Sequence, residues 1–339
     1  MPSQMAPFHT REIEDDMTKR KLICTMVASA ALLAMPGAVF AQESPKVIRF
    51  VVPYAPGGLP DTVARIVAQH LQQNSGKTVV VENRPGANGA VAAAALATSP
   101  ADGSTFLVTD GSMITINPLI TKNMSYNPDK DLVPVSLIAT SPLFLATNAN
   151  VKANTLDEFI KLAKANGASM NYGSSGIGSS HHLAMEALKA GLGIPLQHIP
   201  YKGSGASVPA LVGSQVDVVY SAYPSLAGFA KDGKVKILAT NSATRSSLAP
   251  NVPAVAEKLP GYDFAVRVIA LARAGTPQPV IQTMSSEIAK VVKEADVVSK
   301  FKSAGIEPVG GSPAQLEEAL KAEKERMAVA GKQAHLLPE

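Results

Sequence analysis

The chain has 339 residues, of which 46% are hydrophobic, 17% are charged and 5% are aromatic, with no tryptophan. This composition suits one large or two medium globular domains whose core is built from valine, isoleucine, leucine and alanine. The formal net charge of +4 is compatible with anionic solutes, and no run of lysine or arginine is interleaved with aromatic residues, which argues against a nucleic-acid partner.

The N-terminal region carries the pattern of a secretory signal peptide. Basic residues 19–21 precede an apolar run at 22–34, and a small residue, Ala41, follows at the expected cleavage position. The run is shorter than the about 20 apolar residues of a membrane helix. We therefore expect export to the periplasm with cleavage after Ala41. The acidic segment before it does not belong to a signal peptide, so Met17 is the expected start and residues 1–16 an over-long extension.

Cys24 is the only cysteine, and it lies at the front of the apolar run. The mature chain would therefore contain no cysteine, which fits an oxidising compartment and excludes disulfides, thiolate metal sites and cysteine nucleophiles. We expect no metal, no cofactor and no catalytic residues.

From residue 47 onward, short β-branched apolar runs alternate with apolar residues at helical spacing. The predicted strands are 47–52, 78–81, 105–109, 143–147, 170–172, 196–200, 216–221, 235–240 and 264–271. The predicted helices are 61–73, 89–98, 156–165, 179–190, 206–212, 279–294 and 313–330. This alternation predicts an α/β fold with largely parallel sheets.

The stretch 51–65, VVPYAPGGLPDTVAR, predicts a buried strand, a glycine turn and the first turn of a helix. Such a turn directs backbone N–H groups and the positive end of the helix dipole into one space, which makes an anion site. We expect the N–H groups of Gly57, Gly58 and Leu59 to face a solute carboxylate; the alternative is a βα turn without a ligand. Asp61 would repel an anion, so we expect it to organise the loop. The candidate binding residues here are Tyr54, Ala55, Pro56, Gly57, Gly58 and Asp61.

A second glycine-rich turn, NYGSSGIGSSHH at 171–182, leads from a short strand into a helix. Ser179 or Ser180 is the predicted N-cap, and the spare hydroxyl and N–H groups can hold a carboxylate. The alternative is that the serines only cap the helix. The candidate binding residues are Ser174, Ser175, Gly178, Ser179 and His181.

Two further strand ends carry candidates, because open α/β sheets place ligands at the carboxyl ends of strands. Thr109, Gly111 and Ser112 follow one strand, and Tyr201, Lys202 and Gly203 follow another. Lys202 can neutralise an anion or simply be solvated.

His181 and His182 adjoin four serines, a pattern that invites a hydrolase. No G-x-S-x-G elbow occurs, and adjacent histidines on a helix point in different directions and are poor joint metal ligands. We therefore expect both to cap or pack, and a secreted serine hydrolase using 174–182 stays the alternative function.

The motifs together resemble the Bug family, the TctC-type extracytoplasmic solute-binding proteins of tripartite tricarboxylate transport systems. The matches follow in order from residue 47 to the end. They are APGG (55–58), VVVENRPGANG (79–89), PADGSTFLV (100–108), INP (116–118), NYGSSGIGS (171–179), PYKG (200–203) and NVPAVAE (251–257).

The resemblance implies a two-domain, type II periplasmic-binding-protein fold with a ligand cleft between the domains. Residues 42–142 and 265–339 would form domain 1, and residues 143–264 domain 2. It implies a non-enzymatic monomer that binds a small organic carboxylate and delivers it to transporter membrane subunits or to a sensor ectodomain. The signal peptide and the lack of a DNA-binding helix-turn-helix disfavour a cytoplasmic effector-sensing domain.

The chain departs from the family pattern at two positions that the resemblance places near the cleft. Ser221 stands where the family commonly has aspartate, and Arg267-Val268 stands where it commonly has tryptophan. Ser221 is therefore a further candidate binding residue, and the identity of the solute does not carry over from any one relative.

Overall fold

The structure is a computed structural model that describes residues 45–336 except Lys122 and Lys202, without the side chain of Asn88. The predictions about Met17, Cys24, cleavage after Ala41 and Lys202 therefore lie outside the described residues.

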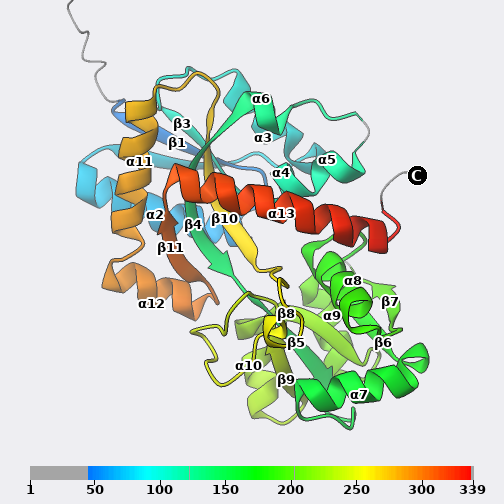
Figure 1. The fold of residues 1–339 in the computed structure, drawn as a ribbon. Coiled ribbons are helices and arrows are strands. Elements are labelled where there is room, and N and C mark those ends of the chain that lie inside the picture. The colour runs from blue at the N-terminus through cyan, green and yellow to red at the C-terminus, as the bar shows by residue number, and fades with distance from the viewer. Residues whose placement is uncertain (1–44, 122, 202, 337–339) are drawn as a thin grey trace, which may run out of the picture. The chain divides into compact units, whose positions relative to one another are not determined.

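The described strands form two sheets (Figure 1). One contains β1 (Val47–Val52), β2 (Thr78–Asn83), β3 (Thr105–Asp110), β4 (Leu132–Ser141), β10 (Val266–Arg273) and β11 (Glu307–Gly311). The other contains β5 (Leu143–Asn148), β6 (Asn171–Ser174), β7 (Gln197–Pro200), β8 (Val218–Ala222) and β9 (Val235–Thr240). The strand orders are β11-β4-β10-β3-β1-β2 and β7-β6-β8-β5-β9.

The chain passes from the six-stranded to the five-stranded sheet at Pro142, the residue between β4 and β5, and returns at β10. The assignment of residues 143–264 to a separate domain stays a prediction.

The prediction of largely parallel sheets is wrong in part. β1 pairs in parallel with β2 and β3, and β6 with β7 and β8. β10 runs antiparallel to β3 and β4, β11 antiparallel to β4, and β5 antiparallel to β8 and β9. A crossover helix makes neighbouring strands parallel only when both strands belong to one sheet. The connections before β5 and β10 lead instead from one sheet to the other, so the strand–helix alternation does not fix their direction.

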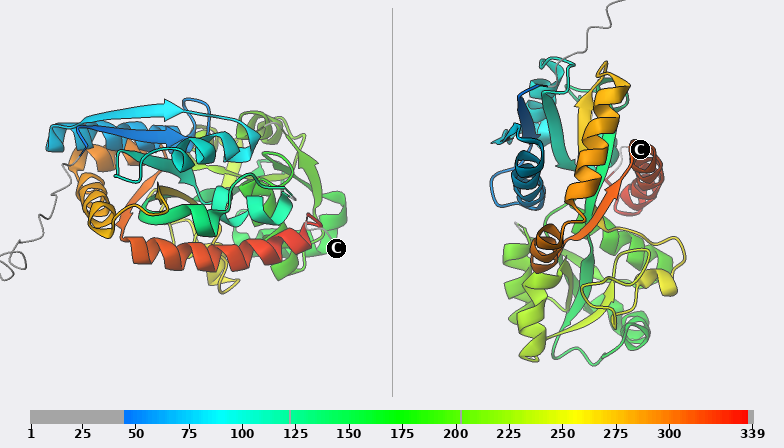
Figure 2. Two further views of the ribbon diagram at one scale, coloured as in Figure 1. Left: turned by 90° about the horizontal axis from the view of Figure 1, so that it is seen from above. Right: turned by 90° about the vertical axis from the view of Figure 1, so that its left-hand side faces the viewer.

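Helices cover both faces of the six-stranded sheet (Figure 2). On one face are α2 (Leu59–Ser75), α11 (Gln278–Val291) and α12 (Ala295–Ser303); on the other are α3 (Ala90–Ala97), α4 (Ser112–Thr115) and α13 (Pro313–Gln333). Strand alternation separates the two cores, since Phe50 and Val52 pack on the first face and Val51 on the second.

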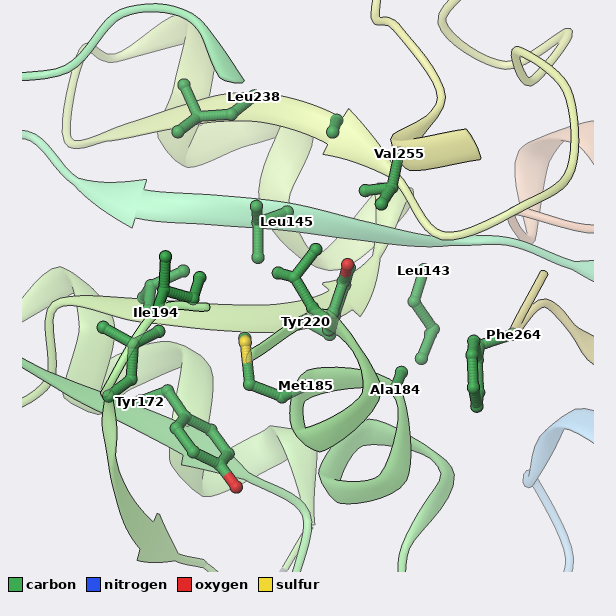
Figure 3. Packing of buried hydrophobic residues seen from close by; sticks show 14 of the residues in the cluster. Leu143, Leu145, Tyr172, Ala184, Met185, Ile194, Tyr220, Leu238, Val255 and Phe264 are labelled. Atoms are coloured by element: carbon green, nitrogen blue, oxygen red, sulfur yellow. The ribbon is translucent and has the colours of Figure 1, made fainter. Parts of the chain in front are cut away.

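The five-stranded sheet is covered in the same way. α7 (Leu156–Asn166) and α8 (Ser180–Leu192) lie on one face, and α9 (Ser204–Val212) and α10 (Tyr223–Lys231) on the other. Figure 3 shows the first of these cores, where Met185 of α8 shares a cluster with Tyr172 and Tyr220 of the sheet. Met327 and Ala330 of α13 belong to the same cluster, so this helix contacts both sheets' cores.

Every predicted strand and helix is present, with ends that shift by a few residues. The sequence did not predict β4, β11, α10, α12 or the short helices α4, α5 (Asn117–Ile120) and α6 (Pro128–Asp131). Single 3-10 turns also occur at Ala87–Gly89, Gly167–Ser169 and Val255–Glu257. β11 has the sequence EPVGG, whose proline and glycines are poor strand formers, and its pairing with β4 is irregular.

Candidate functional site

Asp61 organises the first glycine turn, as its position in the first turn of α2 led us to expect. Its side chain is buried, with a relative exposure of 2%. Oδ2 accepts hydrogen bonds from the Gly57 N–H at 2.8 Å and from Arg65 Nε at 2.9 Å. Oδ1 accepts one from Asn83 Nδ2 at 2.8 Å. The carboxylate therefore ties the turn to the helix and to the end of β2.

The charge of Asp61 is compensated within the turn. Burial alone would raise its pKa, but the hydrogen bonds from Arg65, the Gly57 N–H and Asn83 outweigh burial and lower the pKa below its usual value. The aspartate is therefore ionised, and its ion pair with Arg65 reduces the repulsion that an anionic solute would meet.

The prediction that three backbone donors of this turn face a solute is wrong for Gly57, because its N–H is taken by Asp61. The N–H groups of Gly58 and Leu59 have no hydrogen-bond partner among the described residues. Residue Pro60, next in the helix, has no N–H. Two free donors thus remain at the start of the helix, where its dipole favours an anion.

The end of β3 lies beside this turn. The Tyr54 hydroxyl is 3.4 Å from Ser112 Oγ, and both the Ser112 hydroxyl and its N–H donate to Asp110 Oδ1. Burial, with the charge of Asp110, raises the pKa of Tyr54, so its hydroxyl stays protonated. Thr109 is buried, and its hydroxyl has no partner among the described residues.

A buried ion pair lies beneath Gly111. Arg267 Nη1 donates to Glu323 Oε2 at 2.9 Å, and Glu323 Oε1 accepts from Thr115 Oγ1 at 3.0 Å. A Cβ at Gly111 would overlap the Glu323 carboxylate, and the Gly111 N–H is used by the Arg267 carbonyl. Arg267 is one of the two departures from the family pattern. It holds the end of β3 in place, through its carbonyl to Gly111 and through its side chain to Glu323.

In the second turn, Ser179 is the N-cap of α8, since its Oγ accepts the His182 N–H at 3.2 Å. Ser174 Oγ accepts the Gly176 N–H at 3.0 Å and lies 2.7 Å from His198 Nε2. Ser179 therefore caps the helix, as the alternative interpretation has it, and the Ser174 hydroxyl is used within the loop and by His198. The hydroxyl of Ser175 has no partner among the described residues.

Two histidine rings stack under this turn. The centroids of His182 and His198 are 4.1 Å apart, and Tyr172 stacks on His198 at 4.8 Å. His182 Nδ1 accepts the Gly178 N–H at 3.1 Å, so this donor is also taken and the ring carries its proton on Nε2 when neutral. Sequence reasoning missed His198 because it lies in β7 before the PYKG motif and outside every motif.

Burial lowers the pKa of His198 to about 4, and the neighbouring His182 acts in the same direction. Burial also lowers the pKa of His182, although Glu186 opposes this, and burial lowers the pKa of the partly buried His181 to about 4. The stack is therefore uncharged near neutral pH.

Unpartnered buried hydroxyls gather at the carboxyl ends of β6 and β8. These strands are parallel with Gly173 opposite Val219, so the register brings Ser175 level with Ser221. The Ser221 hydroxyl is buried without a described partner, as is that of Ser207 on the adjacent α9. Buried polar groups without partners are few in folded proteins, and a ligand or ordered water is a common explanation. Sequence reasoning missed Ser207, which has no motif.

The other candidates shape the loops. The Tyr201 N–H donates to the Ser174 carbonyl at 3.1 Å, and the Gly203 N–H donates to the Ser175 carbonyl at 3.3 Å. Gly203 has φ +90° and precedes α9. Ala55 and Pro56 are exposed.

The structure brings the candidates together as two groups, 54–61 with 109–112 and 174–181 with 201–221. No hydrogen bond between described residues joins the 54–61 turn to the 174–181 turn. A Cβ at Gly178 would lie 3.6 Å from Ile120 and 4.0 Å from Leu336, so α5 and the end of the described chain contact the second turn.

Within residues 45–336, no set of three His, Cys, Asp or Glu side chains is grouped to hold a metal ion. No helix of this part of the chain is both long and apolar enough to cross a membrane.

Comparison with known proteins places these features in a family. The family model of the tripartite tricarboxylate transporter family receptor, TctC, matches residues 63–333. A Pseudomonas sp. strain P51 protein, the UPF0065 protein in the tcbD-tcbE intergenic region, is 34% identical over 82% of this chain and 83% of its own. Protein BugT of Bordetella pertussis is 32% identical over 92% of this chain and 96% of its own.

Solved structures agree in fold. Rhodopseudomonas palustris Rpa4515 with adipate has a TM-score of 0.73 and 30% identity, covering 86% of this chain and 98% of that chain. MatC from the same organism, with bound malate, has a TM-score of 0.67 and 27% identity, covering 84% of this chain and 98% of that chain. The two-sheet α/β fold and the matched length show that the chain belongs to the TctC receptor family, the Bug-type periplasmic solute-binding proteins.

Proposed function

We propose that this protein captures a small organic carboxylate in the periplasm and delivers it to the membrane subunits of a tripartite tricarboxylate-type transporter. A sensor ectodomain is the other recipient compatible with the same binding chemistry. The observation that carries the proposal is the pair of unpartnered N–H groups of Gly58 and Leu59 at the start of α2. Backbone donors at a helix N-terminus bind anions without a lysine or arginine.

The groups around these donors suit a carboxylate. Ionised Asp61 is paired with Arg65, and the Tyr54 and Ser112 hydroxyls lie next to the turn. The second group supplies the unpartnered hydroxyls of Ser175, Ser207 and Ser221. One solute carboxylate on the first turn and a polar group on the second would place the solute between the two sheets. The adipate and malate of the two Rhodopseudomonas palustris structures are solutes of this class.

A serine hydrolase finds less support. The Ser174–His198 contact of 2.7 Å is the arrangement of a nucleophile and a base. However, Ser174 is fully buried, its hydroxyl accepts the Gly176 N–H, and no carboxylate among the described residues hydrogen-bonds to His198. The contact therefore stabilises the loop.

A thermal-shift and calorimetric screen tests the proposal. Adipate, malate and related acids are added to the mature protein, with neutral adipamide as the control. Binding to the native state alone raises the melting temperature, so at least one acid should stabilise the protein and adipamide should not. A panel of mono- and dicarboxylates and acidic amino acids without any stabilising member would refute the function.

Export is part of the same proposal. N-terminal sequencing of periplasmic protein should begin at Gln42, after cleavage behind Ala41. Protein retained in the cytoplasm with the segment before Gln42 still attached would contradict it.

A further inference from the structure

A pocket lies away from both glycine turns. It is a shallow, open pocket of about 320 Å³ between α8, α13 and residues 259–264. Its lining includes Leu259, Phe264, Val329, Ala330, Glu325 and Arg326. The volume is at the lower end of the about 300–1,000 Å³ of small-molecule sites. Val329, on the surface of α13, is 57% exposed.

The cation in this pocket is poorly compensated. The Arg326 side chain is only 22% exposed, and its one ion pair among the described residues is Nη2 to Asp263 Oδ2 at 3.6 Å. It makes no hydrogen bond with a described residue, and its Nε is buried without a partner. Burying a guanidinium normally requires hydrogen-bonded partners, so this residue has donors to spare.

The neighbouring charges do not supply what Arg326 lacks. The Asp263 carboxylate is shared with Arg267, which donates a hydrogen bond to the same Oδ2. Glu323 is bound to Arg267 and Thr115. Glu325 is exposed, and among the groups that shift the Arg326 pKa its charge contributes least. Burial contributes most and lowers the pKa of Arg326, as expected for a cation that lacks partners.

We propose that this pocket is a second binding site, for a small amphipathic monocarboxylate such as a medium-chain fatty acid. The carboxylate would pair with the planar guanidinium of Arg326, which matches carboxylate geometry. The hydrocarbon part would lie against Leu259, Phe264 and Val329. The walls offer no second cation, so this chemistry differs from that of a dicarboxylate site. The inference does not depend on which solute the glycine turns bind.

Calorimetric titration with octanoate tests the site in the mature protein. Octanoate should bind the wild type, and Arg326→Gln should weaken its binding about tenfold or more, as expected for losing charge-assisted hydrogen bonds. Val329→Asp, a change at an exposed position, should weaken it similarly by placing a negative charge on the apolar rim. Lys321→Gln is the matched control, because it removes a cation from the same helix outside this pocket and should change the affinity less than about twofold.

Three outcomes would overturn the proposal. If octanoate does not bind at millimolar concentration, the proposed site does not exist. Octanol binding as tightly as octanoate would exclude a role for the guanidinium. Octanoate binding that survives Arg326→Gln and Val329→Asp but is lost in Gly58→Val, or is displaced by adipate, would place the acid at the glycine turns instead. Octanoate binding that requires Arg326, in a protein that binds no other acid of the screening panel, would support the second site while refuting the proposed function. Circular dichroism confirms that each variant is folded.

Discussion

The backbone N–H of Gly57 donates a 2.8 Å hydrogen bond to the buried carboxylate of Asp61. The bond uses one of the three N–H donors that the sequence assigned to the solute. It also fixes the turn so that the next two N–H groups, of Gly58 and Leu59, stay free at the start of α2. The aspartate thus shapes the turn that we propose as an anion site, and its own oxygens are used by Gly57, Arg65 and Asn83.

Asp61→Asn should therefore lower both stability and solute affinity. The variant loses the ion pair with Arg65 and leaves a buried donor without an acceptor, at a cost of about 1–3 kcal/mol. The pKa of Asp61 is lowered in the folded state, so its contribution is present above its unfolded pKa and disappears as pH falls through the folded pKa. Urea unfolding at several pH values should show a difference from wild type that is constant near neutral pH and shrinks in acid. A difference that grows in acid would contradict this role.

Gly58→Val should remove most of the solute affinity from a folded protein. Gly58 has an extended backbone (φ −71°), and a Cβ there would meet Ala55 O at an ordinary 3.6 Å. The side chain would cover the free N–H groups. Losing a charge-assisted hydrogen bond costs about 1.5–3 kcal/mol, or about one to two decades in Kd.

Gly57→Val is the matched comparison. Gly57 has φ +88°, which a β-branched residue adopts only with strain, although nothing within 4 Å would obstruct its Cβ. This variant should lose stability, whereas Gly58→Val should melt close to wild type. Unchanged affinity in folded Gly58→Val would mean that the turn is structural and that the solute lies elsewhere.

The sequence predicted the elements whose pattern is local. The VIRFVV strand and the α2 helix carry their own periodicity, and they fold as expected. The direction of β10 and the existence of β11 could not be predicted in this way. Each depends on which sheet the chain has entered, and EPVGG becomes a strand only because β4 offers an edge.

The candidate site shows the same limit. Glycine turns before helices can be read from the chain, and both are present. Which donors and hydroxyls stay free cannot be read from the chain. It depends on partners such as Asn83, which binds Asp61, and His198, which contacts Ser174, and both lie outside the two glycine turns. Arg267 and Glu323 are 56 residues apart, and their pairing under Gly111 follows from packing alone.

The histidine stack should make the protein less stable in weak acid. The pKa of His198 is about 4 in the folded state, against about 6.5 for a free side chain. The unfolded chain binds more protons between these values, so stability falls as pH drops from about 6.5 toward about 4, by at most about 1.4 kcal/mol per pH unit for each histidine. His182 acts in the same direction.

His198→Gln keeps a polar group near Ser174 but does not titrate, so urea unfolding should show a shallower loss of stability over this pH range. Equal slopes in wild type and His198→Gln would mean that the stack takes up no proton on unfolding.

Ser221→Ala should show whether the Ser221 hydroxyl binds the solute or stabilises the fold. The Ser221 hydroxyl is fully buried without a described partner, so its removal breaks no bond in the free protein. Removing an unsatisfied buried polar group is neutral or stabilising. If the hydroxyl binds the solute, the same variant loses a neutral hydrogen bond of about 0.5–1.5 kcal/mol, which weakens Kd about two- to tenfold.

Thr147→Val provides the matched control. Thr147 is also fully buried with an unpartnered hydroxyl, but it pairs with Val218 at the start of β8, whereas Ser221 lies near the carboxyl end of that strand. Both variants should melt at or above the wild-type temperature, and only Ser221→Ala should weaken binding of the acid found in the screen. Equal affinities in the two variants would place the solute away from the end of β8, and a clear loss of stability in Ser221→Ala would show that its hydroxyl serves the fold.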